Sequence, residues 1–225
     1  MAPEPLLTIC LLNYRRPGNL HRIIATLTEQ TIGPRLFLWN NSGRPFKHPA
    51  IDWQVDSSRN ILCPPRWWMG SFAETPFVAS WDDDLIPTDA RLFEDLVART
   101  AEQPADRLVG LSGAVMRPGR HYRRQRRIRR PLEDRAADLV RGLCVVVRTE
   151  TLRNAIRLGD LTGEIGREED IVLSGALAAG RKCYHLIPGG FRGRYRRLRQ
   201  GRHALRKRPG QKDLREAARR RWLAQ

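Results

Sequence analysis

The sequence predicts an α/β protein with a mostly parallel central sheet, flanked by helices and followed by a basic C-terminal extension. Apolar, strand-like runs alternate along the chain with segments whose apolar residues recur at helical spacing. This order is typical of β-α-β units, whose strands lie parallel. Several of these runs end in polar or glycine-containing turns. The 225 residues are enough for one compact unit with a substantial core.

The first half of the chain is expected to contain four strands and two helices. The strands are predicted at residues 6–12, 36–39, 54–55 and 77–81, and the helices at residues 19–30 and 65–74. The turn after the first strand lacks the G-x-G-x-x-G of dinucleotide-binding folds and the glycine-rich, lysine-bearing loop of kinases and ATPases. Both of these protein classes are therefore excluded.

The second half continues the alternation with one interruption. Thr88 is expected to cap a helix that has Asp89 in its first turn. Further strands are predicted at residues 108–111, 143–147 and 183–187, and further helices at residues 151–158, 171–179 and 213–222. Residues 117–130 carry eight arginines and no acid, so they are expected to form an exposed, mobile loop.

The net charge of +17 is concentrated in two segments. One is the arginine-rich run at 117–130, and the other is residues 189–225, which carry fourteen Lys and Arg. The rest of the chain is mildly acidic, unlike a uniformly basic nucleic-acid binder, so nucleic acid is a disfavoured partner. We expect one domain at residues 1–190, with halves at about 1–87 and 88–190, and a basic tail at 191–225.

Composition also bears on compartment. No run approaches the roughly 18 apolar residues that span a bilayer, and the opening residues lack the basic start of a signal peptide. A cytoplasmic protein is expected, with peripheral membrane contact through its basic segments as an option. Cys10, Cys63, Cys144 and Cys183 show no metal-binding spacing, so buried free thiols are predicted, with a pairing of two of them left open by the sequence.

Three consecutive aspartates, Asp82 to Asp84, end the apolar run 77–81. If the backbone stays extended, Asp82 and Asp84 project to one side. A divalent cation lets both stay ionised, and all-oxygen ligation favours Mg²⁺ or Mn²⁺. The alternative is a solvated acidic turn before a helix. The position at the carboxyl end of a strand favours a ligand site.

A second acidic pair, Glu169 and Asp170, precedes the predicted helix 171–179. Acids at a helix N-terminus also have a structural explanation, because they complement the helix dipole. The residues alone leave both interpretations open.

Taken together, the motifs resemble those of a GT-A-fold glycosyltransferase, and more narrowly the exostosin-type hexosaminyltransferases. The matching segments span most of the chain and occur in the family's order. They are Asn13-Tyr14-Arg15, Trp39-Asn40-Asn41, Glu74-Thr75 before the aspartates, Val109-Gly110, Glu169-Asp170-Ile171 and His203-Ala204-Leu205. The resemblance implies a Rossmann-like GT-A sheet. A more distant similarity is to family-2 glycosyltransferases.

The resemblance also implies a UDP-sugar donor, with an N-acetylhexosamine as the transferred sugar, and a Mn²⁺ or Mg²⁺ cofactor. Asp82 would face the ribose, and Asp84 and His203 would hold the metal. The residues expected to contact the nucleotide sugar are Asn13, Arg15, Asn41, Arg66, Asp82, Asp83, Arg206 and Lys207. Residues 192–208 are expected to close over the donor.

Asp170, with Glu169 beside it, is the expected catalytic residue. In a retaining, exostosin-type enzyme it would stabilise the reacting sugar, and in an inverting family-2 enzyme it would be the general base. The acceptor is unknown, and the basic segments suit an anionic one. Nucleotidyltransfer is a weaker alternative because the glycine-rich loop is missing. A non-enzymatic protein that binds nucleic acid or an anionic membrane would explain the charge alone.

Overall fold

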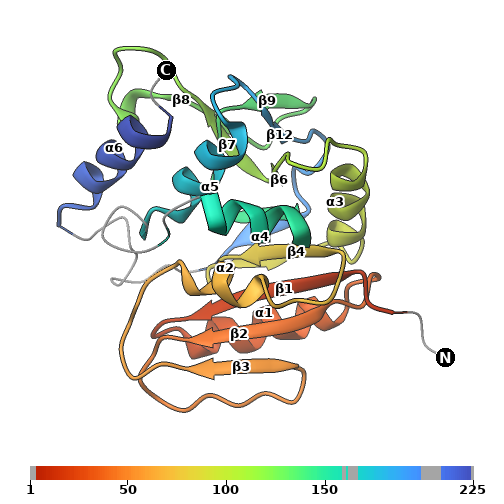
Figure 1. The fold of residues 1–225 in the computed structure, drawn as a ribbon. Helices are drawn as coiled ribbons and strands as arrows, with labels where there is room; N and C mark the ends of the chain where they lie inside the picture. The colour runs from red at the N-terminus through yellow and green to blue at the C-terminus, as the bar shows by residue number, and fades with distance from the viewer. Residues whose placement is uncertain (1–3, 159–160, 162–166, 199–208, 224–225) are drawn as a thin grey trace.

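The computed structural model describes residues 4–158, 161, 167–198 and 209–223, and its centre is an eight-stranded sheet (Figure 1). In spatial order the strands are β3 (Trp53–Asp56), β2 (Arg35–Asn40), β1 (Leu7–Asn13), β4 (Phe77–Trp81), β11 (Cys144–Arg148), β6 (Val109–Gly110), β12 (His185–Ile187) and β9 (Arg135–Ala137). Neighbours are parallel except where β11 meets β4 and β6, and where β12 meets β9. The predicted α/β class with a mostly parallel sheet is confirmed.

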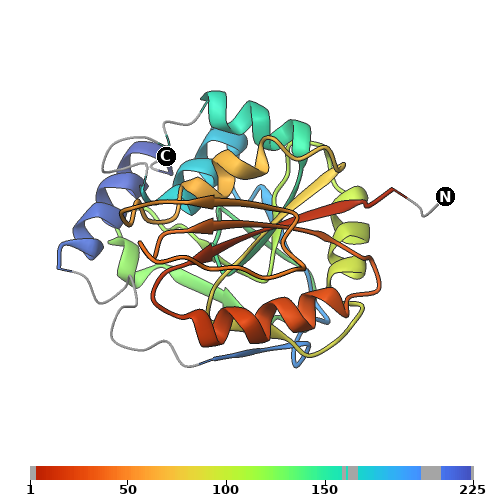
Figure 2. The same cartoon turned by 90° about the horizontal axis from the view of Figure 1, so that it is seen from below.

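Helices cover both faces of this sheet, as Figure 2 shows. The helices are α1 (Pro17–Thr28), α2 (Pro65–Gly70), α3 (Leu92–Ala101), α4 (Thr149–Leu158) and α5 (Glu169–Ala178). Strand β1 explains the two layers, because Ile9 joins the core under α1 and α3 whereas Cys10 joins the core under α2, α4 and α5. In the part of the chain that the structure describes, no helix is long and apolar enough to cross a membrane.

The predicted strands and helices are present, with shifted bounds, but the start of α3 differs from the prediction. The helix begins at Leu92, after Arg91, and has Glu94 and Asp95 in its first turn. Thr88 makes no cap and instead donates from Oγ1 to the carbonyl of Gly193. The expected capping by Thr88 is therefore wrong, because the helix starts four residues later and the Thr88 hydroxyl binds the turn at Gly193.

The arginine-rich segment is not the loop that its composition predicts. It contains a 3₁₀ turn, η1 (Tyr122–Arg124), and a strand, β8 (Arg126–Arg129). β8 pairs with β7 (Ser112–Val115), which also pairs with β10 (Leu139–Val140), in an antiparallel sheet of three strands. Of the four β8 residues only Ile128 is buried. The sequence therefore shows too little alternation of apolar and polar residues to indicate a strand.

The basic tail is also more ordered than its composition predicts. Strand β13 (Tyr195–Arg197) pairs with β5 (Leu85–Pro87), and α6 (Gln211–Trp222) packs on α5. Close packing there needs a glycine, because a Cβ on Gly175 would lie 2.5 Å from the carbonyl oxygen of Trp222. The predicted terminal helix is confirmed. The expected lid at 192–208 lies partly outside the described residues, and its described part contains β13.

The four cysteines are free thiols, as predicted, but the burial expected of them holds for only two. Cys10 and Cys144 are buried, and burial raises the pKa of the Cys10 thiol to about 12. Cys63 and Cys183 are half-buried.

His185 in β12 makes the stability of the protein depend on pH. Burial lowers the pKa of its imidazole to about 4. Its Nδ1 accepts from the Leu108 N–H at 3.2 Å, so Nε2 carries the proton and donates to the Ser174 carbonyl at 2.8 Å. The unfolded chain takes up a proton near pH 6.5 but the folded chain does not, so stability present above pH 6.5 is lost as the pH falls toward 4.

We expect the free energy of unfolding to fall by about 3 kcal/mol between pH 6.5 and 4 through His185 alone. Urea denaturation at several pH values measures it. His185→Gln keeps a donor for Ser174 and does not titrate, so its slope over this interval should be flatter. Parallel pH profiles for the two proteins would contradict this assignment.

Candidate functional site

The candidate site lies where the parallel strands β1, β2 and β4 reach the same edge of the sheet. β1 ends at Asn13, β2 ends at Asn40, and β4 ends at Trp81. Because these strands are parallel, their carboxyl ends meet there, followed directly by Asn41 and the three aspartates. Open α/β sheets bind their ligands at this edge.

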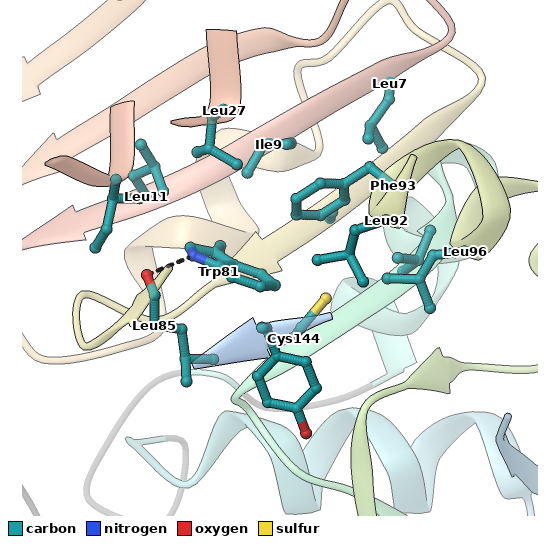
Figure 3. Packing of buried hydrophobic residues seen from close by; sticks show 14 of the residues in the cluster. Leu7, Ile9, Leu11, Leu27, Trp81, Leu85, Leu92, Phe93, Leu96 and Cys144 are labelled. Carbon is teal, nitrogen blue, oxygen red and sulfur yellow. Dashed lines mark hydrogen bonds between the residues drawn. The ribbon is translucent and has the colours of Figure 1, made fainter. Parts of the chain in front are cut away.

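The aspartates lie in a turn and not on an extended strand. β4 ends at Trp81, and the buried indole of Trp81 donates from Nε1 to the carbonyl of Leu85 at 3.0 Å, which closes the turn (Figure 3). The prediction that Asp82 and Asp84 project to one side required an extended backbone. It therefore does not apply to this turn. A fixed turn brings all three carboxylates to one region instead.

Arg66 joins the two acidic segments of the sequence. Its side chain is 3% exposed, and it donates from Nη1 to Asp82 at 2.9 Å and from Nη2 to Glu169. Arg66 lies in the first turn of α2, packed against β1 and β2, and Glu169 starts α5. The structure thus brings together three residues that the sequence analysis had proposed separately.

The other two aspartates pair with basic residues that the sequence analysis did not select. Asp83 accepts from Arg16 at 2.5 Å. Asp84, which is 4% exposed, accepts from Arg197 of β13 at 3.2 Å, and its carbonyl accepts from the Leu198 N–H at 2.7 Å. The tail therefore contacts the aspartate turn directly.

Burial and mutual repulsion raise the pKa values of two aspartates. Burial raises the pKa of Asp82 to about 7, and Arg66 only partly offsets this while the charge of Asp84 adds to it. Burial likewise raises the pKa of Asp83 to about 6, against the lowering effect of Arg16. The Asp82 side chain is 33% exposed, so water moderates its shift. Ionisation of Asp82 and Asp83 is therefore opposed mainly by burial, and their arginine partners offset this only in part.

Asp170 is held by Arg215 of α6. Arg215 donates from Nη2 to Asp170 at 2.8 Å and from Nη1 to Glu168 at 2.6 Å. The N–H groups of Gly142 and Ile171 also donate to Asp170, at 3.3 Å and 2.9 Å. The acids do lie at the start of α5, as the helix-dipole interpretation requires, but each of the three is also paired with an arginine from another element.

The three acids differ in their pKa values. Burial raises the pKa of Glu168 to about 7, and burial also raises that of Glu169, with Arg66 opposing it. Burial acts in the same direction on Asp170, but the charge and hydrogen bonds of Arg215 outweigh it, so the pKa of Asp170 is lowered. Asp170 is thus ionised and a weak base at neutral pH.

The two predicted asparagines are buried at the strand ends. Asn13 donates from Nδ2 to Asn40 Oδ1 at 2.9 Å, and no described residue donates to its buried Oδ1. Asn41 binds the backbone of Leu62 and Ile61 and so fixes the loop after β3. A buried acceptor without a donor is rare in proteins, so Asn13 Oδ1 suits a ligand N–H.

The remaining predicted residues lie away from this cluster or outside the described residues. Arg15 is exposed, has a φ of 57°, and its guanidinium lies over the ring of Tyr14 at 5.3 Å. Its neighbour Arg16 makes the contact with the turn. His203, Arg206 and Lys207 fall in residues 199–208, which are outside the described part.

The aspartate turn fits a divalent cation. Among the described residues, no three Asp, Glu, His or Cys side chains form a metal cage by themselves. Mg²⁺ sites commonly use only one or two carboxylates and take further oxygens from substrate phosphates and water, and Mn²⁺ accepts the same ligands. Carboxylate oxygens under mutual repulsion, with the pKa values of Asp82 and Asp83 raised, match this requirement.

Sequence reasoning missed Arg16, Glu168, Arg197 and Arg215. Arg16 was adjacent to a selected residue, and the chain contains no spacing that links Arg215 to Asp170, 45 residues earlier. The only available signal was the excess of acids at 168–170, which requires cations from elsewhere when buried.

A hollow of about 290 Å³ lies apart from this site, between β8 and β9. It is lined in part by Arg126, Ile128, Pro131 and Arg135, and none of the site residues described above borders it. The candidate site is therefore defined by its chemistry at the sheet edge and not by this hollow.

Arg66 is expected to be important for stability. Arg66→Met would leave Asp82 and Glu169 without their partner, so we expect the free energy of unfolding to fall by about 3–5 kcal/mol, measured by urea denaturation. The control Arg35→Met removes an exposed pair with Glu74 and should change it by less than about 1 kcal/mol. Equal effects would contradict the buried role of Arg66.

Comparison with known proteins shows the fold. No protein-family model matches the chain, and no curated protein matches it significantly. Among solved structures, the mannosyltransferase PcManGT from Pyrobaculum calidifontis, in complex with GDP-Man and Mn²⁺, matches 91% of this chain with a TM-score of 0.60 and 13% sequence identity. The chain spans 60% of the length of that protein. This likeness confirms the Rossmann-like GT-A fold expected from the sequence.

Proposed function

We propose that this chain is a metal-dependent glycosyltransferase that uses a nucleotide-sugar donor. The observation that carries the proposal is the convergence of the aspartate turn, Arg66 and the Glu169–Asp170 pair at the carboxyl edge of a GT-A sheet. The buried, unsatisfied Oδ1 of Asn13 at the same edge suits an N–H of a nucleobase. The likeness to a protein solved with GDP-Man and Mn²⁺ supports the same class.

In this proposal the aspartate turn holds the metal and the donor. Asp84 would ligate the cation, and Asp82 would face the ribose. When bound, the metal would neutralise the charge that grows on the diphosphate as the glycosidic bond breaks. Arg66 keeps the acidic turn and α5 at a fixed separation, because it donates to both Asp82 and Glu169.

Asp170 supports a retaining reaction of the exostosin type. Its pKa is lowered because Arg215 stabilises the carboxylate, so it is a poor proton acceptor at neutral pH. A fixed negative charge is suited to stabilising the positive charge that develops on the sugar. The inverting alternative, with Asp170 as general base, is favoured less by these contacts because they lower the pKa of Asp170.

Two donor classes are proposed. The ordered motifs resemble exostosin-type enzymes and favour a UDP-linked N-acetylhexosamine, which is our first candidate. GDP-mannose is the second candidate, because the matching mannosyltransferase was solved with it. Both donors place a diphosphate beside the metal and differ in the nucleobase near Asn13.

The test is release of free nucleotide from a panel of donors. The chain is incubated with Mn²⁺ and UDP-N-acetylglucosamine, UDP-N-acetylgalactosamine, UDP-glucose or GDP-mannose, and UDP or GDP is measured. We expect slow release from UDP-N-acetylhexosamines without acceptor. NMR of the transfer product then decides between retention and inversion. No nucleotide release from any donor would contradict the proposed function and favour a basic binding protein.

A further inference from the structure

Arginines of β8 project from one face of the three-stranded sheet. Arg127 lies opposite Ala114 of β7, and Arg129 lies opposite Ser112. Directly opposite residues of an antiparallel pair project to the same face, and residues two apart on a strand share a face. Arg127 and Arg129 therefore project from the face that carries Ala114 and Ser112, and both side chains are exposed.

Arg141 extends this face toward Asp170. Leu139 of β10 lies opposite Ala114, so Arg141, two residues on, continues the same side, and its N–H donates to the β7 backbone at 2.7 Å. The next residue, Gly142, donates its N–H to Asp170 Oδ2 at 3.3 Å. The row of arginines thus leads to the carboxylate that we place at the reacting sugar.

These three arginines lack acidic partners in the described part of the chain. No described acid forms an ion pair with Arg127, Arg129 or Arg141, whereas Arg215 nearby is paired with Glu168 and Asp170. Burial lowers the pKa of Arg127, and the charges of Arg141 and Arg129 lower it further, so the guanidinium groups are close enough to repel each other. Ordered strands hold these like charges together without an ion pair among the described residues, and the charge of Arg141 acts on Asp170, whose pKa it lowers.

We propose that Arg127, Arg129 and Arg141 bind an oxyanion of the acceptor, with phosphate as the group that matches their geometry, beside Asp170. Guanidinium forks bind phosphate oxygens in pairs, and a group with two negative charges needs more than one of them. The inference rests on the proposed function, because it assigns these arginines to the acceptor. A phosphate-bearing acceptor would then present its hydroxyl group at the site where the sugar is transferred.

The test uses inorganic tripolyphosphate as the probe and the full chain in metal-free buffer. Arg127→Glu/Arg129→Glu should weaken calorimetric binding by about 30-fold, because charge-assisted contacts become repulsive. The matched control is Arg22→Glu/Lys47→Glu, which reverses the same number of charges at two exposed residues that do not line the hollow beside β8, and it should change binding by less than about threefold. Arg127→Gln/Arg129→Gln gives a milder variant, and circular dichroism checks that each variant folds.

Equal weakening by Arg22→Glu/Lys47→Glu would overturn the proposal, because binding would then reflect net charge alone, and no weakening in Arg127→Glu/Arg129→Glu would overturn it because the probe would then bind elsewhere. UDP with Mn²⁺ should leave tripolyphosphate binding in place, and complete displacement would assign the probe to the donor site and also overturn it. This binding test needs no catalysis, so it can succeed even where the chain releases no nucleotide, which would contradict only the proposed function.

The source of the oxyanion is found by a second measurement. Sedimentation with phosphatidylcholine vesicles, with and without phosphatidic acid, shows whether a lipid-borne phosphate binds. Sedimentation that needs phosphatidic acid and is lost in Arg127→Glu/Arg129→Glu supports the site with a lipid source. Binding of free tripolyphosphate without sedimentation supports it with a soluble source. Sedimentation that both Arg127→Glu/Arg129→Glu and Arg127→Gln/Arg129→Gln keep would contradict a role for this face at membranes.

Discussion

Asp170→Asn is expected to lower kcat by about a thousandfold while the donor dissociation constant changes by less than about threefold. Asparagine has the same size, and its one oxygen can still accept from Arg215 and the Gly142 N–H, although the Ile171 N–H loses its acceptor, so circular dichroism and thermal unfolding check that the variant folds. What is lost is the negative charge that we propose lies beside the reacting sugar. An interaction made mainly in the transition state affects turnover and not ground-state binding.

The measurement is nucleotide release under saturating donor, combined with calorimetry of donor binding. Asp106→Asn is the control, because Asp106 forms a half-exposed pair with Arg181 away from the sheet edge. It should retain wild-type turnover. If Asp170→Asn keeps a near wild-type kcat, the acid serves only the dipole of α5.

Asp84→Asn is expected to remove metal-dependent activity almost completely, by at least about a thousandfold at subsaturating Mn²⁺. Asp84 is buried in the turn that Trp81 closes, so the carboxylate has a fixed position. The substitution would remove the proposed charged metal ligand. With less metal bound, the donor diphosphate would face Asp82 and Asp83 with less positive charge between them.

Nucleotide release measured against Mn²⁺ concentration distinguishes this from misfolding. Asp84→Asn should need far more Mn²⁺ for any residual activity, with thermal unfolding close to wild type. Asp134→Asn, at an exposed pair with Arg99, should follow the wild-type curve. An unchanged Mn²⁺ dependence in Asp84→Asn would remove Asp84 from the metal site.

The parts of the fold that sequence reasoning predicted are those with strong hydrophobic periodicity. The strands around Ile9 and Val78 are continuous apolar runs, and α1 has Leu20, Ile23 and Ile24 at helical spacing, so local pattern and tertiary burial agree. β8 was not predicted because three of its four residues are exposed arginines. Its strand conformation is fixed by pairing with β7 and not by a local apolar pattern.

The site was predicted in part for a related reason. Asp82 and Asp84 were visible because they end an apolar strand, and Glu169 and Asp170 because they start an apolar helix. Their arginine partners come from distant elements, and tertiary pairing such as that of Arg215 leaves no periodic signal in the chain. The Val109-Gly110 motif also has a structural explanation. A Cβ on Gly110 would lie 2.6 Å from the Cys144 carbonyl oxygen, so glycine is required for this close packing.

The central claim is that the aspartate turn binds a nucleotide diphosphate through a divalent cation. Calorimetric titration of the wild-type chain with UDP and with GDP, each in Mn²⁺ and in metal-free buffer, tests it most directly. We predict measurable binding of UDP in Mn²⁺ and at least about tenfold weaker binding without metal, because the carboxylates and the diphosphate then repel each other. Equal affinity with and without Mn²⁺, or no binding of either nucleotide, would contradict the account.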